Sequence, residues 1–316
     1  MSSSDHPTSA HARPFHLGLK IQHLRVLATL AEVGLVSRVA DALHLTQSAV
    51  SKQITEIEGA VPTPVFYRER NRLYLTAAGK RLAFHAQTVL NQLHRAELEV
   101  QAVGLGETGH IRVATVTSLA PTLVAKAITL FKEAAPQVSI SVVEGHFRSV
   151  RPMLERGEID LAIARMWQKQ DLPGIERQML SAEPIVVTCG RDHPLLKRRR
   201  PTWGDACSWP WILPEQQSVA RQALDAFWVE HDLTPPSDVI EAQSLPLNLA
   251  LMQSMPRLCL FPESLAMSHA ARGELVVLNL RLENLLVEAG CFWRTGHLLH
   301  NEASRLFVDC LVAVGR

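Results

Sequence analysis

The stretch Val36–Glu58, V-S-R-V-A-D-A-L-H-L-T-Q-S-A-V-S-K-Q-I-T-E-I-E, predicts two short helices joined by a tight turn. Its apolar residues are spaced to meet in one small core: Val39, Leu43, Leu45, Val50, Ile54 and Ile57. Ala40 stands where the two helices approach most closely, and Ser37 and Thr46 are suitable N-caps for the first and second helix. The stretch therefore predicts a helix-turn-helix.

The second helix should begin at Gln47 and carry polar side chains on the face away from this core: Gln47, Ser48, Ser51, Lys52 and Thr55. Amide, hydroxyl and ammonium groups suit the base edges and phosphates of a DNA major groove. The alternative is a solvated helix, which would more often carry Glu/Lys pairs on that face. The pattern thus favours a DNA-binding helix.

Composition and length indicate a globular protein of two or three domains, with 316 residues, 47% hydrophobic and 20% charged. The net charge of +1 neither demands nor excludes a nucleic-acid partner, because binding depends on where charges lie. Five scattered cysteines, an odd number without a C-x-x-C pair, predict reduced core residues in a cytoplasm. Residues 1–16 are polar and predict a disordered tail rather than a signal peptide, and no apolar run reaches the roughly 20 residues of a membrane span.

The segments on either side of the helix-turn-helix predict further elements of a DNA-binding domain. Leu19–Val33 has helical apolar spacing and stops at Gly34. After Pro62 and Pro64, two short strands should enclose a basic turn from Arg68 to Arg72, which together form a wing. Its arginines would reach phosphates or a minor groove, although an arginine turn alone is more often only solvated.

A long helix is predicted from Thr76 to about Leu105, with apolar residues that alternate by steps of four and three: Leu82, Ala86, Val89, Leu93, Ala96, Val100 and Val103. This spacing is the seam of a two-stranded coiled coil and predicts dimerisation. Packing of the same stripe onto the chain's own next domain is the alternative. Glycines at 104, 106 and 109 then predict a linker.

From His110 onward, strands and helices alternate, which predicts an α/β domain whose first set of elements forms a βαβαβ unit with a parallel sheet. The first set comprises strands at 110–116, 139–144 and 160–164 and helices at 120–135 and 148–156. The second set comprises strands at 184–189, 211–213, 239–242, 259–261, 275–278 and 285–293 and helices at 219–231, 245–255 and 301–314.

Three runs of sequence resemble the LysR-type transcriptional regulators: A-x-x-L-H-L-T-Q-S-A-V-S-K-Q-I from Ala40, V-F-Y-R-x-R-x-R-L-x-L-T-x-A-G from Val65 and E-R-G-E-I-D-L-A-I-A-R from Glu155. The resemblance implies a winged helix-turn-helix, a linker helix and a two-lobed effector domain like a periplasmic binding protein. The corresponding boundaries are 17–76, 77–108 and 109–316, with lobe I at about 109–183 and 283–316 and lobe II at about 184–282.

The same resemblance implies homodimers that pair into homotetramers on promoter DNA, with a small molecule between the lobes that changes how the DNA is bent. It assigns DNA contacts to Thr46, Gln47, Ser48, Ser51 and Lys52, with Arg68 and Arg72 in the wing. We add Ser37, the predicted cap of the first helix, as a further DNA-binding residue. The effector half looks closest to regulators of sugar or aromatic-acid catabolism. The sequence departs from the family at Ser48, where Pro is common, and at Ala60-Val61-Pro62, where Leu-Gly is typical.

Ligands of open α/β sheets bind beyond the carboxyl ends of the strands, where helix N-termini offer free N–H groups to an anion. Six residues follow predicted strands in this way and form the predicted effector site: Thr117, Ser118, His146, Arg165, Ser218 and Ser244. Arg165 would pair with a carboxylate of an anionic effector. Ser118 has the alternative role of an N-cap without a ligand.

Enzyme chemistry finds little support in the sequence. His297 and His300 form H-x-x-H without a further ligand at metal spacing, and no phosphate loop or nucleophile elbow occurs. We therefore expect neither a cofactor nor a metal. The alternative function is a small-molecule-binding protein or enzyme whose N-terminal domain mediates only protein contacts.

Overall fold

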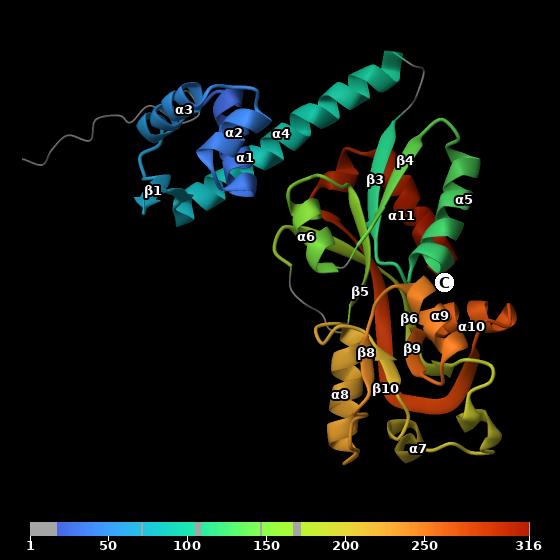
Figure 1. The fold of residues 1–316 in the computed structure, drawn as a ribbon. Helices are drawn as coiled ribbons and strands as arrows, with labels where there is room; N and C mark the ends of the chain where they lie inside the picture. Colours follow the sequence, from blue (N-terminus) through green and yellow to red (C-terminus); the bar gives the residue numbers. More distant parts are fainter. Residues whose placement is uncertain (1–17, 71, 105–108, 146, 167–171, 316) are drawn as a thin grey trace, which may run out of the picture. The chain divides into compact units, whose positions relative to one another are not determined.

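The computed structural model describes residues 18–70, 72–104, 109–145, 147–166 and 172–315, so the predicted N-terminal tail lies outside the described residues. The chain forms two compact units, one built mainly from the residues up to Gly104 and a larger one built from most of the remainder (Figure 1). We describe each unit by itself.

The N-terminal unit is a winged helix-turn-helix followed by a long helix. Its elements are α1 (Ile21–Val33), α2 (Val36–Ala42), α3 (Gln47–Ala60), β1 (Phe66–Glu69), β2 (Arg72–Leu75) and α4 (Ala77–Gly104). α1 ends at Gly34, which has the left-handed conformation predicted for it, with φ 71°. Its core contains the predicted Val39, Val50 and Ile57, all fully buried, together with residues of α1 and α4.

A buried histidine that the sequence pattern did not reveal joins α1 to the recognition helix α3. His23 is 1% exposed, and its Nδ1 accepts the Lys20 backbone N–H at 3.1 Å. Its Nε2 therefore carries the proton and donates to Glu56 Oε2 at 2.9 Å. This hydrogen bond holds the pKa of Glu56 below its usual value, so the carboxylate stays ionised at neutral pH.

A second carboxylate, Glu58, holds the entry into the wing. Glu58 Oε1 accepts the backbone N–H groups of Val65 at 3.1 Å and Phe66 at 2.6 Å. From the other side, Thr76 Oγ1 donates to the carbonyl of Pro64 at 2.7 Å. These bonds fix the path through the proline segment, where the sequence departs from the family pattern.

One predicted cap is wrong. α2 begins at Val36 with Leu35 in the N-cap position, and Ser37 lies exposed inside its first turn. The reason is that α1 ends only at Gly34, which leaves a single extended residue between the two helices. The cap predicted for α3 is confirmed, since the Thr46 side chain accepts the Ala49 N–H at 3.2 Å.

The larger unit contains one eight-stranded sheet of order β4-β3-β5-β10-β6-β9-β7-β8. Its strands are β3 (His110–Thr115), β4 (Ser139–Glu144), β5 (Leu161–Met166), β6 (Ile175–Cys189), β7 (Trp211–Leu213), β8 (Val239–Glu241), β9 (Leu258–Pro262) and β10 (Val276–Arg294). Parallel strands form both flanks, and the long β6 and β10 pair antiparallel in the middle. The predicted two-lobed α/β fold is confirmed.

Helices cover both lobes of this sheet (Figure 1). The first lobe carries η2 (Ala120–Val124), α5 (Ala125–Ala134), α6 (Phe147–Glu155), η4 (His297–Leu299) and α11 (Glu302–Gly315); the second carries η3 (Pro194–Lys197), α7 (Trp203–Cys207), α8 (Val219–Glu230), α9 (Leu245–Ser254) and α10 (Glu263–Ala271). Phe131 and Phe307 meet edge to face at 5.4 Å in the first core, and Trp211 and Trp228 at 6.0 Å in the second.

The prediction missed α10 entirely, and it began β6 at Pro184 instead of Ile175. The cysteines behave as predicted: Cys189, Cys259, Cys291 and Cys310 are buried, and none of the five forms a disulfide. None of the helices in the described ranges combines the length and the apolar composition that a bilayer-spanning segment needs.

A pair of glycines tests how tightly the wing packs on α4. A Cβ at Gly79 would lie 2.1 Å from the Val65 carbonyl oxygen, whereas a Cβ at Gly59, in α3, meets nothing within 4 Å. We expect Gly79→Ala to destabilise the N-terminal unit by about 1–3 kcal/mol, and Gly59→Ala to be neutral or to stabilise it by less than about 1 kcal/mol. Hydrogen exchange of the α1–α4 amides measures both, and equal protection in the two variants would contradict the packing.

Candidate DNA-binding and effector sites

The exposed face of α3 carries the polar residues predicted for it. Gln47, Ser48, Ser51 and Lys52 are all exposed, while Val50 on the opposite side is fully buried. The Thr46 and Ser48 hydroxyls lie 3.0 Å apart and order the first turn of the helix. Four groups capable of base and phosphate contacts therefore share one face.

The wing presents its two predicted arginines differently. In the β1–β2 register, Arg68 lies opposite Leu73 and Arg72 lies opposite Glu69. Because residues alternate between the two faces of a strand, Arg68 shares the face of the buried Phe66, and Arg72 lies on the other face. The two arginines are both exposed and start from opposite faces of the wing.

The larger unit contains a polar group that we call the Arg165 cluster, formed by Ser118, Arg165, Glu183 and Ser264. Arg165, in β5, donates from Nε to Ser118 Oγ at 3.0 Å and from Nη2 to Glu183 Oε1 at 2.7 Å. Glu183 Oε2 accepts the backbone N–H of Ser264 at 2.6 Å. The cluster thus joins the end of β3, the strands β5 and β6, and the first turn of α10.

Burial shapes the electrostatics of this cluster. The side chains of Arg165 and Glu183 are only 10% and 15% exposed. Burial lowers the pKa of Arg165, and the adjacent Glu183 carboxylate opposes that effect. Burial alone would raise the pKa of Glu183, but Arg165 and the Ser264 N–H together hold it below its usual value. Both groups are therefore charged at neutral pH.

One nitrogen of the cluster has no partner. Arg165 Nη1 is buried and makes no hydrogen bond within the described part of the chain. Leaving a buried donor unsatisfied costs about 1–3 kcal/mol, more for a charged group. This nitrogen is therefore the unsatisfied donor of the cluster.

The other predicted effector residues are dispersed. Ser218 caps α8 by accepting the Arg221 N–H at 3.2 Å, and Ser244 stands exposed before α9. Neither is hydrogen-bonded to the Arg165 cluster among the residues the structure describes. Thr117 is half-buried next to Ser118, and His146 lies outside the described residues.

The N-cap role considered for Ser118 is wrong, because Leu119 occupies that position of η2 and the Ser118 hydroxyl accepts from Arg165. Glu183 and Ser264 were missed by the sequence analysis. The signal for Glu183 was a single carboxylate that interrupts an otherwise largely apolar run, S-A-E-P-I-V-V. Ser264 gave none, since its helix was not predicted.

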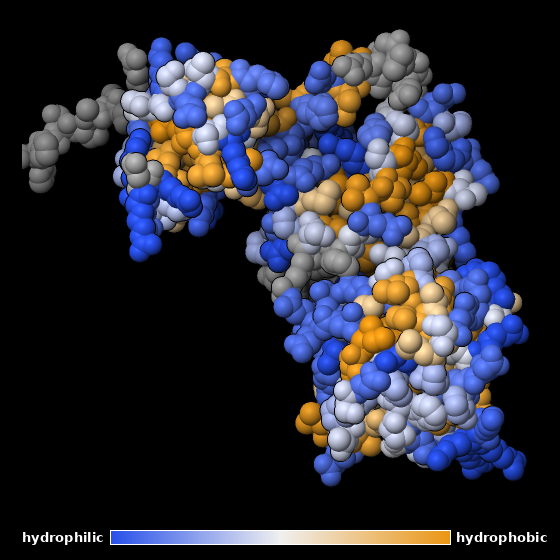
Figure 2. Space-filling view, in the orientation of Figure 1, coloured by the Kyte–Doolittle hydropathy of each residue, from blue (hydrophilic) through white to orange (hydrophobic). Residues whose placement is uncertain are grey.

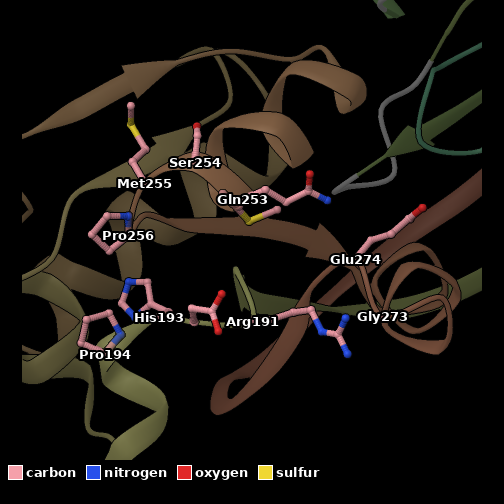
Figure 3. A pocket seen from close by; sticks show the side chains of 11 residues that line it. Arg191, His193, Pro194, Gln253, Ser254, Met255, Pro256, Gly273 and Glu274 are labelled. Carbon is pink, nitrogen blue, oxygen red and sulfur yellow. The ribbon is translucent and has the colours of Figure 1, made fainter.

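A pocket of about 480 Å³ lies in the second lobe (Figure 3), lined by Arg191–Pro194, Met252–Pro256, Gly273 and Glu274. These segments follow the carboxyl end of β6 and precede β9 and β10, whereas Ser264 of the Arg165 cluster follows the carboxyl end of β9. The pocket is therefore at the opposite end of β9 from the cluster and is a separate feature.

Histidines do not gather with other ligands into a metal site in the described ranges. His297, of the H-x-x-H pair, has a largely buried side chain in the first lobe. Its side chain is 7% exposed, and its Nε2 lies 3.1 Å from the Ser304 hydroxyl.

Two family models match this chain. The model described as "Bacterial regulatory helix-turn-helix protein, lysR family" matches residues 21–80, and the model described as "LysR substrate binding domain" matches residues 104–316. Between them they match the helix-turn-helix with its wing and the whole of the larger unit, and residues 81–103 of α4 lie between the two matches.

Similar proteins carry regulatory names. The transcriptional regulator GbpR of Azospirillum brasilense is 27% identical over 276 residues, 87% of this chain and 81% of that protein. GalR of Pseudomonas putida is 26% identical over 96% of this chain and 76% of its own length. Full-length CbnR, solved with its target DNA, has a TM-score of 0.65 at 18% identity and covers 94% of this chain and 100% of its own. At that identity the structural likeness concerns the fold.

The Arg165–Glu183 pair gives a stability prediction. Glu183→Gln leaves a buried guanidinium without its counter-ion, so we expect it to destabilise the larger unit by about 3 kcal/mol, while Asp225→Asn, in the surface pair with Arg221, costs less than about 0.5 kcal/mol. Urea unfolding followed by tryptophan fluorescence measures this unit alone, because all six tryptophans lie between residues 167 and 293.

The pH dependence follows from the lowered pKa of Glu183. The contribution of the ionised carboxylate is complete above the ordinary Glu value and disappears as the pH falls through the lower folded value. The difference between the wild type and Glu183→Gln should thus be constant near neutrality and shrink only in acid. Equal losses for the Glu183 and Asp225 variants would contradict the assignment.

Proposed function

Because the chain belongs to the LysR family of bacterial helix-turn-helix regulators, we propose that α3 reads promoter DNA and that the Arg165 cluster receives the acidic group of a small-molecule effector. The chain is a DNA-binding transcriptional regulator with an effector-binding domain. The alternative of an N-terminal domain restricted to protein contacts has no support, since the helix-turn-helix match covers residues 21–80.

The proposed DNA contacts divide into base readout and backbone positioning. Gln47 is exposed at the start of α3, where a side-chain amide suits an adenine edge in the major groove. Ser48, Ser51 and Lys52 continue the same face toward neighbouring bases and phosphates. Arg72, on the open face of the wing, is better placed than Arg68 for a phosphate. CbnR, which shares the fold, was solved on its target DNA.

The observation that carries the effector proposal is the unpartnered Nη1 of Arg165. A ligand carboxylate would satisfy this nitrogen with a charge-assisted hydrogen bond, the strongest kind available there. Glu183 already holds Nη2 and Ser118 accepts from Nε, so one carboxylate oxygen at Nη1 would give each of the three guanidinium nitrogens a partner. We infer that the effector is a small organic acid, such as a sugar acid or an aromatic acid, with Thr117 beside it.

Effector binding would be transmitted by closing of the lobes. Ser218 and Ser244 begin helices of the second lobe and would approach the ligand from that side. A ligand that binds the closed form more tightly shifts the population toward it. In the assembly, that shift would change how the regulator bends promoter DNA in the cytoplasm.

The assembly we propose is a homotetramer built from dimers that pair through α4. Val89, Leu93 and Val100 on its predicted seam are 46%, 45% and 74% exposed. Ala86, at the start of the same stripe, is buried in the N-terminal core instead. The seam therefore remains free over its later part, where a second copy of α4 would bury it.

The DNA-binding roles predict different losses for two variants. Gln47→Ala should cost about 1–3 kcal/mol on the preferred sequence and little on random duplex, because it removes a base contact. Arg72→Ala should weaken both alike and reduce the salt dependence of binding by about one phosphate. Fluorescence anisotropy with both duplexes across a salt series measures this. If both variants lose equal affinity on both duplexes, the division is wrong.

The effector role is tested with the double variant Arg165→Gln/Glu183→Gln, which leaves no buried charge behind. Thermal shift against a panel of sugar acids and aromatic acids should find compounds that stabilise the wild type but not the double variant. The neutral amide of a stabilising acid should shift neither protein, because Nη1 prefers an anion. A compound that stabilises both proteins equally would place its site elsewhere.

A further inference from the structure

A short segment of the second lobe carries charge that neither proposed site uses. Residues 191–200 read R-D-H-P-L-L-K-R-R-R, and we call them the basic loop. Five of its ten residues are cations and only Asp192 is acidic. The loop follows β6 and contains η3.

The backbone of the basic loop is anchored on both sides. Leu195 is 1% exposed in the second core, and the buried His193 accepts its N–H at Nδ1, at 3.1 Å. After the loop, Thr202 and Asp205 form a capping box at the start of α7, and Asp205 also pairs with Arg198. The loop is thus ordered before any partner arrives, which lowers the entropic cost of binding.

Three cations of the basic loop have no internal counter-ion. Lys197, Arg199 and Arg200 are exposed, and no hydrogen bond or ion pair involves their side chains in the part of the chain that the structure describes. Figure 2 shows strongly hydrophilic surface beside α7, the helix that follows the loop. Adjacent like charges repel one another, so an external polyanion would stabilise this arrangement.

The surroundings of the loop favour phosphates over an acidic protein as the partner. Protein interfaces usually depend on exposed aromatic or apolar anchors. The tryptophans near this loop are packed inward: Trp203 against Phe227 at 4.7 Å, Trp209 against His193 at 4.7 Å, and Trp211 fully buried. Met255, which lines the pocket beside residues 191–194, is 38% exposed, but the charges at Lys197, Arg199 and Arg200 suit the sequence-independent contacts that proteins make to a nucleic-acid backbone.

We propose that the basic loop is a second DNA-binding site, which holds phosphates of the duplex outside the operator read by α3. The basic loop would not discriminate between DNA base sequences. Its contribution is energetic, because contacts to flanking DNA offset the cost of bending the duplex toward the effector half. The number of phosphates held would then depend on how far the flanks extend.

The test is the full-length variant Lys197→Gln/Arg199→Gln/Arg200→Gln, which keeps the Arg198–Asp205 pair. An operator sequence is first selected with the wild-type protein from a random DNA pool. The affinity of each protein is then measured over a series of salt concentrations on two duplexes, one as long as the operator and one that extends beyond it on both sides. Each lost phosphate contact lowers the slope of log K against log salt by about 0.9, so we expect a decrease of about 2–3 per contacting protomer on the flanked duplex and none on the short one.

Controls separate this site from general effects. Arg199→Lys/Arg200→Lys keeps the charge and should keep the slope, and Lys126→Gln, an exposed cation of α5, should leave both slopes unchanged. Hydroxyl-radical footprints should show protected flanking sugars that the triple variant exposes. The proposal is overturned if the triple variant has the wild-type slope on the flanked duplex, or if its slope decreases by the same amount on the flanked and the short duplex. A wild-type slope with lost activation of purified RNA polymerase would assign the loop to an acidic protein instead.

Discussion

The backbone ladder between β6 and β10 is the constraint on which the effector half depends. The two strands pair antiparallel from Val276 opposite Cys189 at one end to Arg294 opposite Ile175 at the other, and both lobes are built outward from them. Each lobe has its own cores, and the ladder runs through both lobes. It is interrupted by register shifts between Val277 and Leu286, where bulges let paired strands bend without separating. Any movement of one lobe against the other must pass through this pair.

The Arg165 cluster is placed by the same ladder. Glu183 stands opposite Val287 in the pairing of β6 with β10, and from there its carboxylate reaches both Arg165 and the first turn of α10. Withdrawing a guanidinium from water is expensive, and a single carboxylate cannot satisfy all of its N–H groups. The cluster therefore combines a structural ion pair with one incomplete position. Under the proposed effector role, a ligand that filled this position in only one lobe arrangement would favour that arrangement.

Local sequence patterns predicted much of this fold. The features that they did not predict depend on pairing between residues far apart in the sequence. The helix-turn-helix, its Thr46 cap, the Gly34 stop and the wing follow from residues a few positions apart. Of the predicted effector residues, Ser118 and Arg165 do meet, because Ser118 follows β3 and Arg165 lies near the end of β5, the strand that pairs parallel with β3. Glu183 and Ser264 could not be predicted, since their positions depend on the β6–β10 register and on α10, whose apolar residues form no clear stripe.

Glu58 has a consequence for how such a regulator can change its target. Its carboxylate belongs to α3 and accepts the backbone N–H groups of Val65 and Phe66 at the start of the wing, so direct hydrogen bonds tie the wing to the recognition helix. The proposed roles place α3 on the bases and the wing on the phosphate backbone. The interior of the N-terminal unit then sets the distance along the duplex between these two contacts. Substitutions on the exposed face of α3 can exchange one operator for another of the same length. An operator with a different distance between the base contacts and the backbone contacts would require substitutions in the protein interior. We therefore expect the spacing within a half-site to evolve more slowly than its base sequence.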